Sequence, residues 1–151
     1  AIFQGDTINT PSMLVVEDAI DGLKWAESIG GQPTLVVRSK NNLAAITQWV
    51  ERTPWIDFLV ADPAIRSSTS VCLKVVDEWF QRLATDTQRA TVKRLEALLE
   101  AEGVAYDIAG HRDAPPGLRI WCGSTVERSD VEALLPWLDW AYGEVRRAAA
   151  A

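Results

Sequence analysis

The stretch Ile56–Val76, IDFLVADPAIRSSTSVCLKVV, contains two apolar, β-branched runs separated by a loop of polar turn residues. The runs Ile56–Val60 and Thr69–Val76 have the composition of β-strands. The intervening segment, Asp62–Ser68, contains a proline and two serines, which favour a reversal of the chain. We therefore expect an antiparallel hairpin with a longer loop, in which Arg66 is an ordinary surface charge.

Two segments downstream of this hairpin predict amphipathic helices. Thr85–Gln88 and Ser129–Glu132 both have the capping-box pattern, in which a hydroxyl side chain is followed three residues later by Gln or Glu. Apolar residues recur at helical spacing after each box. The first helix is expected to end at Gly103, and the second to run through Val145 into a frayed tail at residues 148–151.

Two further apolar runs predict strands that complete the fold. Val104–Ile108 and Leu118–Cys122 are short and bounded by turn residues. From Trp55 onward the predicted order is therefore β-β-α-β-β-α. This order places the chain in the α+β class, with helices laid on a mostly antiparallel sheet.

The N-terminal part of the chain carries a helix start and an ambiguous segment. In Asn9-Thr10-Pro11-Ser12, the Thr10 hydroxyl is expected to cap a helix whose first residue is proline. The free N–H groups of such a start, together with Asn9 and Thr10, can bind an anion, although both side chains can equally serve as caps alone. From Pro33 to Arg52 the residues leave helix and strand open, because Thr34–Val37 is strand-like while later apolar residues have helical spacing.

Composition narrows the class of protein. The chain has 151 residues, 48% hydrophobic, and a formal net charge of −6, which fit one soluble domain or one domain with part of another. An acidic chain without a Lys/Arg run is not expected to bind nucleic acid or anionic membranes. Cys72 and Cys122 lack metal-ligand spacing and the chain has one histidine, so we expect no metal site and two buried free thiols.

A cationic run near the C-terminal end is the strongest functional signal. Gly110–Cys122 holds His111, Arg112 and Arg119 around a Pro-Pro-Gly turn. Arginine suits carboxylates and phosphates because its planar fork donates two parallel hydrogen bonds. The run therefore predicts a site for a small anion. The alternative is structural: Arg119 would pair with a core carboxylate, and His111 and Arg112 would satisfy loop carbonyls.

No reactive group accompanies these cations. Neither a Gly-rich phosphate loop nor a nucleophile elbow is present, and none of the lysines occupies a marked position. The sequence thus offers groups that hold a ligand and predicts no catalytic residue within the chain.

Three segments together resemble the phosphoserine aminotransferase family, most closely its alphaproteobacterial form. They are Phe3–Leu14, Thr53–Phe58 and Gly110–Gly123, which stand in the family's order and cover essentially the whole chain. The resemblance is to the C-terminal portion of a class V, fold-type-I enzyme that depends on pyridoxal phosphate. It implies that residues 1–32 end the large cofactor-binding domain and that residues 33–151 form the small domain with a long linking helix, which favours helix for residues 33–52.

The resemblance also implies an activity and roles for particular residues. The family works as a cytoplasmic homodimer in serine biosynthesis and interconverts 3-phosphoserine plus 2-oxoglutarate with 3-phosphohydroxypyruvate plus glutamate. Asn9 and Thr10 would bind the cofactor phosphate of the neighbouring subunit. Arg119 would hold the substrate α-carboxylate, and His111 and Arg112 the distal phosphate or carboxylate.

One departure from the family concerns activity. The Schiff-base lysine, the cofactor-stacking aromatic and the pyridine-nitrogen carboxylate lie upstream in the family, and their motifs are absent here. We therefore expect a fragment that is inactive without the missing N-terminal large domain. The open alternatives are another class V aminotransferase, the same enzyme acting on phosphohydroxythreonine, and a non-enzymatic anion-binding α+β module.

Overall fold

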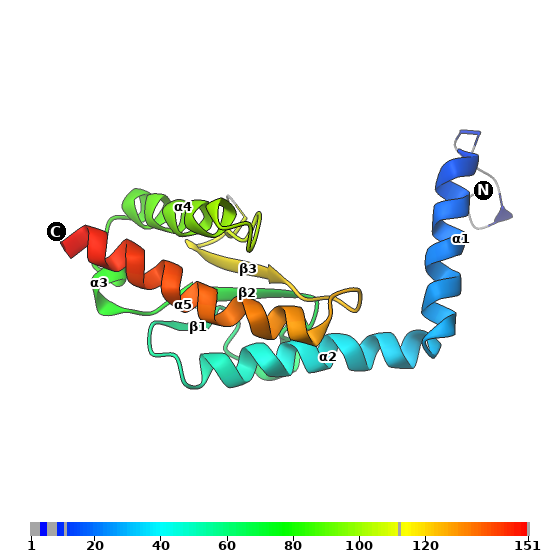
Figure 1. Ribbon diagram of the computed structural model, residues 1–151, viewed down its shortest axis with the longest axis horizontal. Helices are drawn as coiled ribbons and strands as arrows, with labels where there is room; N and C mark the ends of the chain where they lie inside the picture. Colours follow the sequence, from blue (N-terminus) through cyan, green and yellow to red (C-terminus); the bar gives the residue numbers. More distant parts are fainter. Residues whose placement is uncertain (1–3, 6–8, 11, 112, 151) are drawn as a thin grey trace. The chain divides into compact units, whose positions relative to one another are not determined.

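The computed structural model describes residues 4–5, 9–10, 12–111 and 113–150. The chain divides into two compact units, Ala1–Val36 and Val37–Ala151. The first contains helix α1 (Met13–Ser28) and the start of helix α2 (Gly31–Val50), both labelled in Figure 1. Residues 33–40 are therefore helical, as the resemblance predicted and the local Thr34–Val37 pattern did not.

Three strands form one antiparallel sheet in the part of the chain that the structure describes, in the order β1-β2-β3. They are β1 (Ile56–Phe58), β2 (Ser70–Val75) and β3 (Gly117–Trp121). The predicted hairpin is confirmed, with Ile56 opposite Val75. Its loop contains a 3₁₀ turn, Pro63–Ile65, and Asp62 is the N-cap of that turn. The Asp62 carboxylate accepts a hydrogen bond from the Ala64 N–H.

Helices α4 (Thr85–Ala101) and α5 (Arg128–Ala150) pack against each other and cover the sheet together with α2 (Figure 1). A short helix that the sequence analysis did not predict, α3 (Glu78–Gln81), joins β2 to α4. The alternating residues of the strands point into this core, which explains the burial of every second position of β2. The buried strand residues are Ile56, Phe58, Val71, Leu73, Val75, Leu118 and Ile120.

The opposite face of the sheet is half-exposed and polar. It carries Asp57, Lys74, Cys72 and Arg119, and Arg119 lies directly across from Cys72 in the register of β2 and β3. Lys74 and Asp57 are 3.6 Å apart on this face. A sheet covered by helices on one face only confirms the α+β class and leaves its second face available to other groups.

The prediction of a strand at Val104–Ile108 is wrong. These residues form turns and bends, and Asp107 has a φ of 52°, in the left-handed region that is incompatible with an extended strand. Only the end of the segment approaches the sheet: Ala109 forms an isolated antiparallel bridge with Leu118. The apolar character of this run serves burial of Ile108 in the core instead.

The predicted helix starts are displaced. α1 begins at Met13 with Ser12 as its N-cap, so Thr10 is not the cap, and Pro11 lies outside the described residues. Ala84 is the N-cap of α4, which overturns the capping box at Thr85.

The other helix corrections concern α5. It begins at Arg128, whose Nε donates to the Glu132 carboxylate at 2.7 Å, so the Glu132 side chain of the predicted capping box is engaged within the first turn. The C-terminal alanines, predicted as a frayed tail, continue the helix to Ala150.

Arg66, expected to be a solvated surface charge, is instead built into the hairpin loop. Its guanidinium donates to the carbonyls of Val60 and Ala61, each at 2.8 Å, and lies over the Phe58 ring at 3.9 Å from the ring centroid. These contacts combine loop closure with a cation–π interaction. Arg66 is therefore a structural residue of the hairpin.

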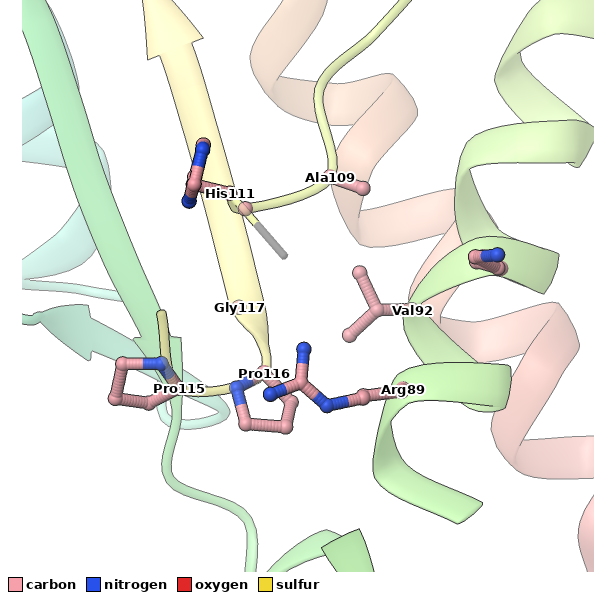
Figure 2. Close-up of a pocket in the computed structure, with 9 residues that line it drawn as sticks. Arg89, Val92, Ala109, His111, Pro115, Pro116 and Gly117 are labelled. Carbon is pink, nitrogen blue, oxygen red and sulfur yellow. The ribbon is translucent and has the colours of Figure 1, made fainter. Parts of the chain in front are cut away.

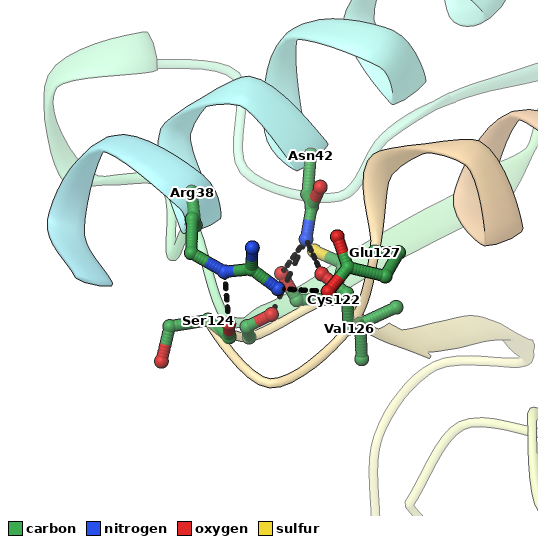
Figure 3. Close-up of polar contacts among 7 residues, drawn as sticks. Arg38, Asn42, Cys122, Ser124, Val126 and Glu127 are labelled. Carbon is green, nitrogen blue, oxygen red and sulfur yellow. Dashed lines mark hydrogen bonds and ion pairs between the residues drawn. The ribbon is translucent and has the colours of Figure 1, made fainter. Parts of the chain in front are cut away.

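A polar cluster ties α2 to the loop between β3 and α5 (Figure 3). The Asn42 amide is 1% exposed and donates to the carbonyls of Cys122, Gly123 and Val126 at 3.0, 3.2 and 3.0 Å. One helical turn away, Arg38 donates to the Ser124 carbonyl at 2.7 Å and pairs with Glu127. Asn42 and Arg38 thus donate hydrogen bonds to backbone carbonyls that lie beyond the end of β3. We call these residues the Asn42 cluster.

Candidate anion-binding site

Arg119 occupies the middle of β3 on the half-exposed face of the sheet. Its backbone N–H donates to the Ile108 carbonyl at 2.7 Å, which fixes the strand position from which the side chain projects. The guanidinium is 3.2 Å from the Asp107 carboxylate. The side chain of Asp107 is 88% exposed and that of Arg119 38% exposed. An ion pair so exposed contributes about 0–1 kcal/mol, so an incoming carboxylate can compete with Asp107 for the arginine fork.

His111 lies in the turn that precedes β3 and is exposed. Its Nδ1 accepts a hydrogen bond from the Asp113 N–H at 3.2 Å. In the neutral imidazole this contact places the proton on Nε2, which is then a donor that a ligand can use. The Ala114 N–H donates to the His111 carbonyl at 2.8 Å, which closes the turn. Arg112, predicted beside it, lies outside the described residues.

The two predicted cation positions line different cavities. His111 borders a cavity of about 530 Å³ that is closed by Gly117 and the two prolines before it and, on the other side, by α4 (Figure 2). Arg119 borders a second cavity of about 590 Å³, together with Asp107, Tyr106 and Trp121. The structure therefore does not bring Arg119 and His111 into one pocket, although the bridge from Ala109 to Leu118 joins the segments that carry them.

The sequence analysis missed two cationic residues of the first cavity. Arg89 and Lys93 of α4 line it with His111. In Figure 2, the Arg89 side chain extends from α4 toward Pro116, while the His111 ring does not point toward Arg89. The i, i+4 spacing of Arg89 and Lys93 on a predicted helix is a signal that they share a face. That face meets the cationic run only through the tertiary fold, which the spacing alone does not reveal.

Asn9 and Thr10, the predicted phosphate-binding residues, belong to the first compact unit and are exposed. They precede the N-terminus of α1, and the N-cap Ser12 makes no side-chain capping hydrogen bond. An exposed amide and an exposed hydroxyl are donors that suit a phosphate group.

The two cysteines differ in their exposure. Both are free thiols; Cys122 is buried, while Cys72 is only partly buried, contrary to expectation. Burial raises the pKa of the Cys122 thiol to about 11, so it stays protonated at neutral pH. Among the described residues, no group of three His, Cys, Asp or Glu side chains could hold a metal ion. No helix in the same residues is long and apolar enough to cross a membrane.

Comparison with known proteins shows which proteins this chain is similar to. No protein-family model matches the chain. The chain is 50% identical to the phosphoserine aminotransferases of Methanosarcina mazei and Methanosarcina barkeri over 145 residues, which is 96% of its length. Over nearly its whole length, the chain is similar to one part of these phosphoserine aminotransferases. The resemblance inferred from the sequence is thereby confirmed, while the expectation of an alphaproteobacterial form stays a prediction.

The match covers only part of each relative. The chain spans about a third of the length of these phosphoserine aminotransferases, 36% of each. It is also 27% identical over 131 residues to the phosphoserine aminotransferase of Phocaeicola vulgatus, of which it spans 34%.

Solved structures agree on the fold. The phosphoserine aminotransferase from Bacillus circulans subsp. alkalophilus superposes with a TM-score of 0.72 at 20% identity, over 90% of this chain and 34% of that one. A structure described as showing radiation damage of the Schiff base in phosphoserine aminotransferase gives a TM-score of 0.73 at 16% identity, over 95% of this chain and 36% of that one. At such identities the likeness concerns the fold alone.

Proposed function

We propose that this chain is the C-terminal part of a pyridoxal-phosphate-dependent phosphoserine aminotransferase and supplies its substrate-anchoring cations. Residues 1–32 would end the large domain and residues 33–151 would form the small domain. The enzyme would act as a cytoplasmic homodimer and interconvert 3-phosphoserine and 2-oxoglutarate with 3-phosphohydroxypyruvate and glutamate. The observation that carries the proposal is the Arg119 guanidinium, presented on the half-exposed sheet face against an exposed carboxylate.

Arg119 suits the carboxylate that all of these substrates share. Its strand position is fixed by backbone pairing with β2 and by the bond to the Ile108 carbonyl. Because Asp107 is almost fully exposed, its displacement by a substrate carboxylate costs little. A bidentate pair with the substrate would then orient the amino-acid end of the ligand.

His111 and Arg112 would bind the far end of the substrate. That end is a phosphate in phosphoserine and a carboxylate in glutamate, and a donor such as the His111 Nε2–H serves both. In this proposal, the two cavities bordered by Arg119 and His111 would give the two anions of one substrate separate anchors.

The residues present also fit a contact with the cofactor. Asn9 and Thr10 offer an exposed amide and an exposed hydroxyl, which would hold the cofactor phosphate of the neighbouring subunit. Pyridoxal phosphate, when bound, supplies the electron sink for amino-group transfer, and the protein supplies orientation. The described lysines would take no covalent part, so this chain alone is expected to be inactive.

The test uses the whole enzyme that carries this chain. Arg119→Lys should slow both half-reactions, measured by stopped-flow with phosphoserine and with glutamate, because lysine lacks the planar fork. The loss expected for one charged hydrogen-bond partner is about one to two decades in kcat/KM. Arg94→Ala serves as the control, since Arg94 is exposed on α4. Unchanged kinetics in Arg119→Lys would overturn the role of Arg119.

A second comparison separates the two ends of the substrate. His111→Ala and Arg112→Ala should slow the phosphoserine half-reaction more than the glutamate half-reaction, because the phosphate is larger and more highly charged. An equal loss for both would show that these residues only support the turn. Turnover of phosphohydroxythreonine beside phosphoserine would mean that the same enzyme also acts on that substrate, whereas a wild-type enzyme that ignores both and uses another amino acid would move the assignment to another class V aminotransferase.

A further inference from the structure

Helix α4 presents one face to the turn that carries His111. Arg89, Val92 and Glu96 are spaced i, i+3 and i+7, so they line up along a single stripe of the helix. Val92 is 5% exposed and anchors the stripe in the core. Arg89 and Glu96, on either side of it, are half-buried. The stripe thus has an apolar residue in its middle and a charged residue at each end. The two charged residues are about two helical turns apart.

Both charged groups bind the backbone of the turn. The Glu96 carboxylate accepts from the Ala109 N–H at 3.1 Å. The Arg89 guanidinium donates to the Ala114 carbonyl at 3.2 Å. Figure 2 shows the same side chain extending from α4 toward Pro116. The two contacts lie on either side of His111, two residues before it and three residues after it. Charged groups that bind backbone atoms form the stronger class of hydrogen bond.

The base of the same turn is closed by the backbone itself. The Gly110 N–H donates to the Gly117 carbonyl at 2.9 Å. This pair joins the two ends of the turn at the start of β3. The side-chain bonds of Arg89 and Glu96 tie the same turn to α4.

We propose that Arg89 and Glu96 are positioning residues that set the placement of the segment 109–117, and thereby of the side chain that binds the distal anion of the substrate. The inference rests on the proposed function. Neither residue needs to touch the substrate, because each acts through the backbone of the turn. Replacement of Arg89 or Glu96 should weaken the binding of phosphoserine more than that of glutamate. The distal phosphate is larger and more highly charged than a carboxylate, so it depends more on a well-placed turn.

The first measurement is hydrogen exchange of the segment 109–117 in the whole enzyme, followed by mass spectrometry. Arg89→Ala and Glu96→Ala should each raise the exchange rate of this segment by about tenfold, the factor equivalent to about 1.4 kcal/mol. Arg94→Ala and Glu100→Ala are the matched controls, since both native residues are exposed on the same helix, and neither should change the rate. Unchanged exchange in Arg89→Ala and Glu96→Ala overturns the inference.

The second measurement compares substrates. The KM for phosphoserine should rise by about tenfold in Arg89→Ala and Glu96→Ala, and the KM for glutamate by about threefold or less. Arg89→Lys and Glu96→Gln, which keep a donor and an acceptor, should restore most of the loss. Faster exchange with equal KM changes for both substrates would show a structural role only and overturn the inference. A wild-type enzyme without phosphoserine turnover would instead overturn the proposed function, and exchange alone would then decide whether α4 positions the turn.

Discussion

Replacement of Asn42 by alanine should be among the most destabilising polar substitutions in the Val37–Ala151 unit. The Asn42 amide is 1% exposed, and its two hydrogens are shared among the carbonyls of Cys122, Gly123 and Val126. Two hydrogen bonds contribute about 2 kcal/mol net, and carbonyls left buried without donors cost about 1–3 kcal/mol more. We therefore expect Asn42→Ala to lower the free energy of unfolding by about 3–5 kcal/mol.

The assay is urea unfolding followed by far-ultraviolet circular dichroism, with Asn41→Ala as the control. Asn41 is the same residue type at the preceding position of α2 but is exposed, so its loss should cost about 0.5 kcal/mol or less. Asn42→Asp should be at least as damaging as the alanine variant, because a carboxylate would place oxygen against three carbonyl oxygens. If Asn42→Ala costs no more than Asn41→Ala, the Asn42 cluster does not anchor the loop and the reasoning is refuted.

Three further predictions concern stability and cofactor retention. Gly117→Ala should destabilise the sheet by about 1–3 kcal/mol in urea unfolding, because a Cβ would lie 2.2 Å from the Leu73 carbonyl oxygen; an unchanged midpoint would contradict this. Because burial raises the pKa of Cys122 from 9.0 to about 11, its stabilising contribution should be complete below pH 9 and fall as the pH rises to 11. Cys122→Ala should flatten that part of the stability curve, and an equal slope in both proteins would rule out the thiol. Thr10→Ala should weaken pyridoxal phosphate retention in the whole enzyme without lowering the melting temperature of the apo-enzyme, since Ser12, not Thr10, is the N-cap of α1. If the melting temperature falls as well, the hydroxyl has a structural role.

Local patterns predicted the elements whose stability is local. The hairpin from Ile56 to Val75 follows from two apolar, β-branched runs and a polar turn between them, and both features are visible in the sequence. Helix α4 was recognised from its apolar spacing, but its start was not, because Gln88 donates to the Phe80 carbonyl at 3.0 Å instead of folding back on Thr85. A helix that the sequence analysis missed, α3, supplies that carbonyl.

Contacts between distant segments were beyond the sequence analysis. Asn42 and Cys122 are 80 positions apart, and nothing in either local pattern indicates that they meet. The same limit hid Arg89, whose partner Ala114 lies 25 positions away. The left-handed backbone at Asp107 interrupts the run predicted as a strand, and the next residue, Ile108, accepts a hydrogen bond from the Arg119 N–H, which lies 11 positions away. The predicted roles of Asn9, Thr10, His111, Arg112 and Arg119 stay predictions until the variants are measured.

The bonds from Ile108 to Arg119 and from Gly110 to Gly117 have a consequence for self-association. They occupy backbone groups along the outer side of β3, which would otherwise present free donors and acceptors to another extended chain. At the other border of the sheet, β1 is only three residues long and carries Asp57 at its centre. Short length and a charged residue both discourage strand addition. Addition of another extended chain at either border of this sheet, as in amyloid-type stacking, is therefore disfavoured.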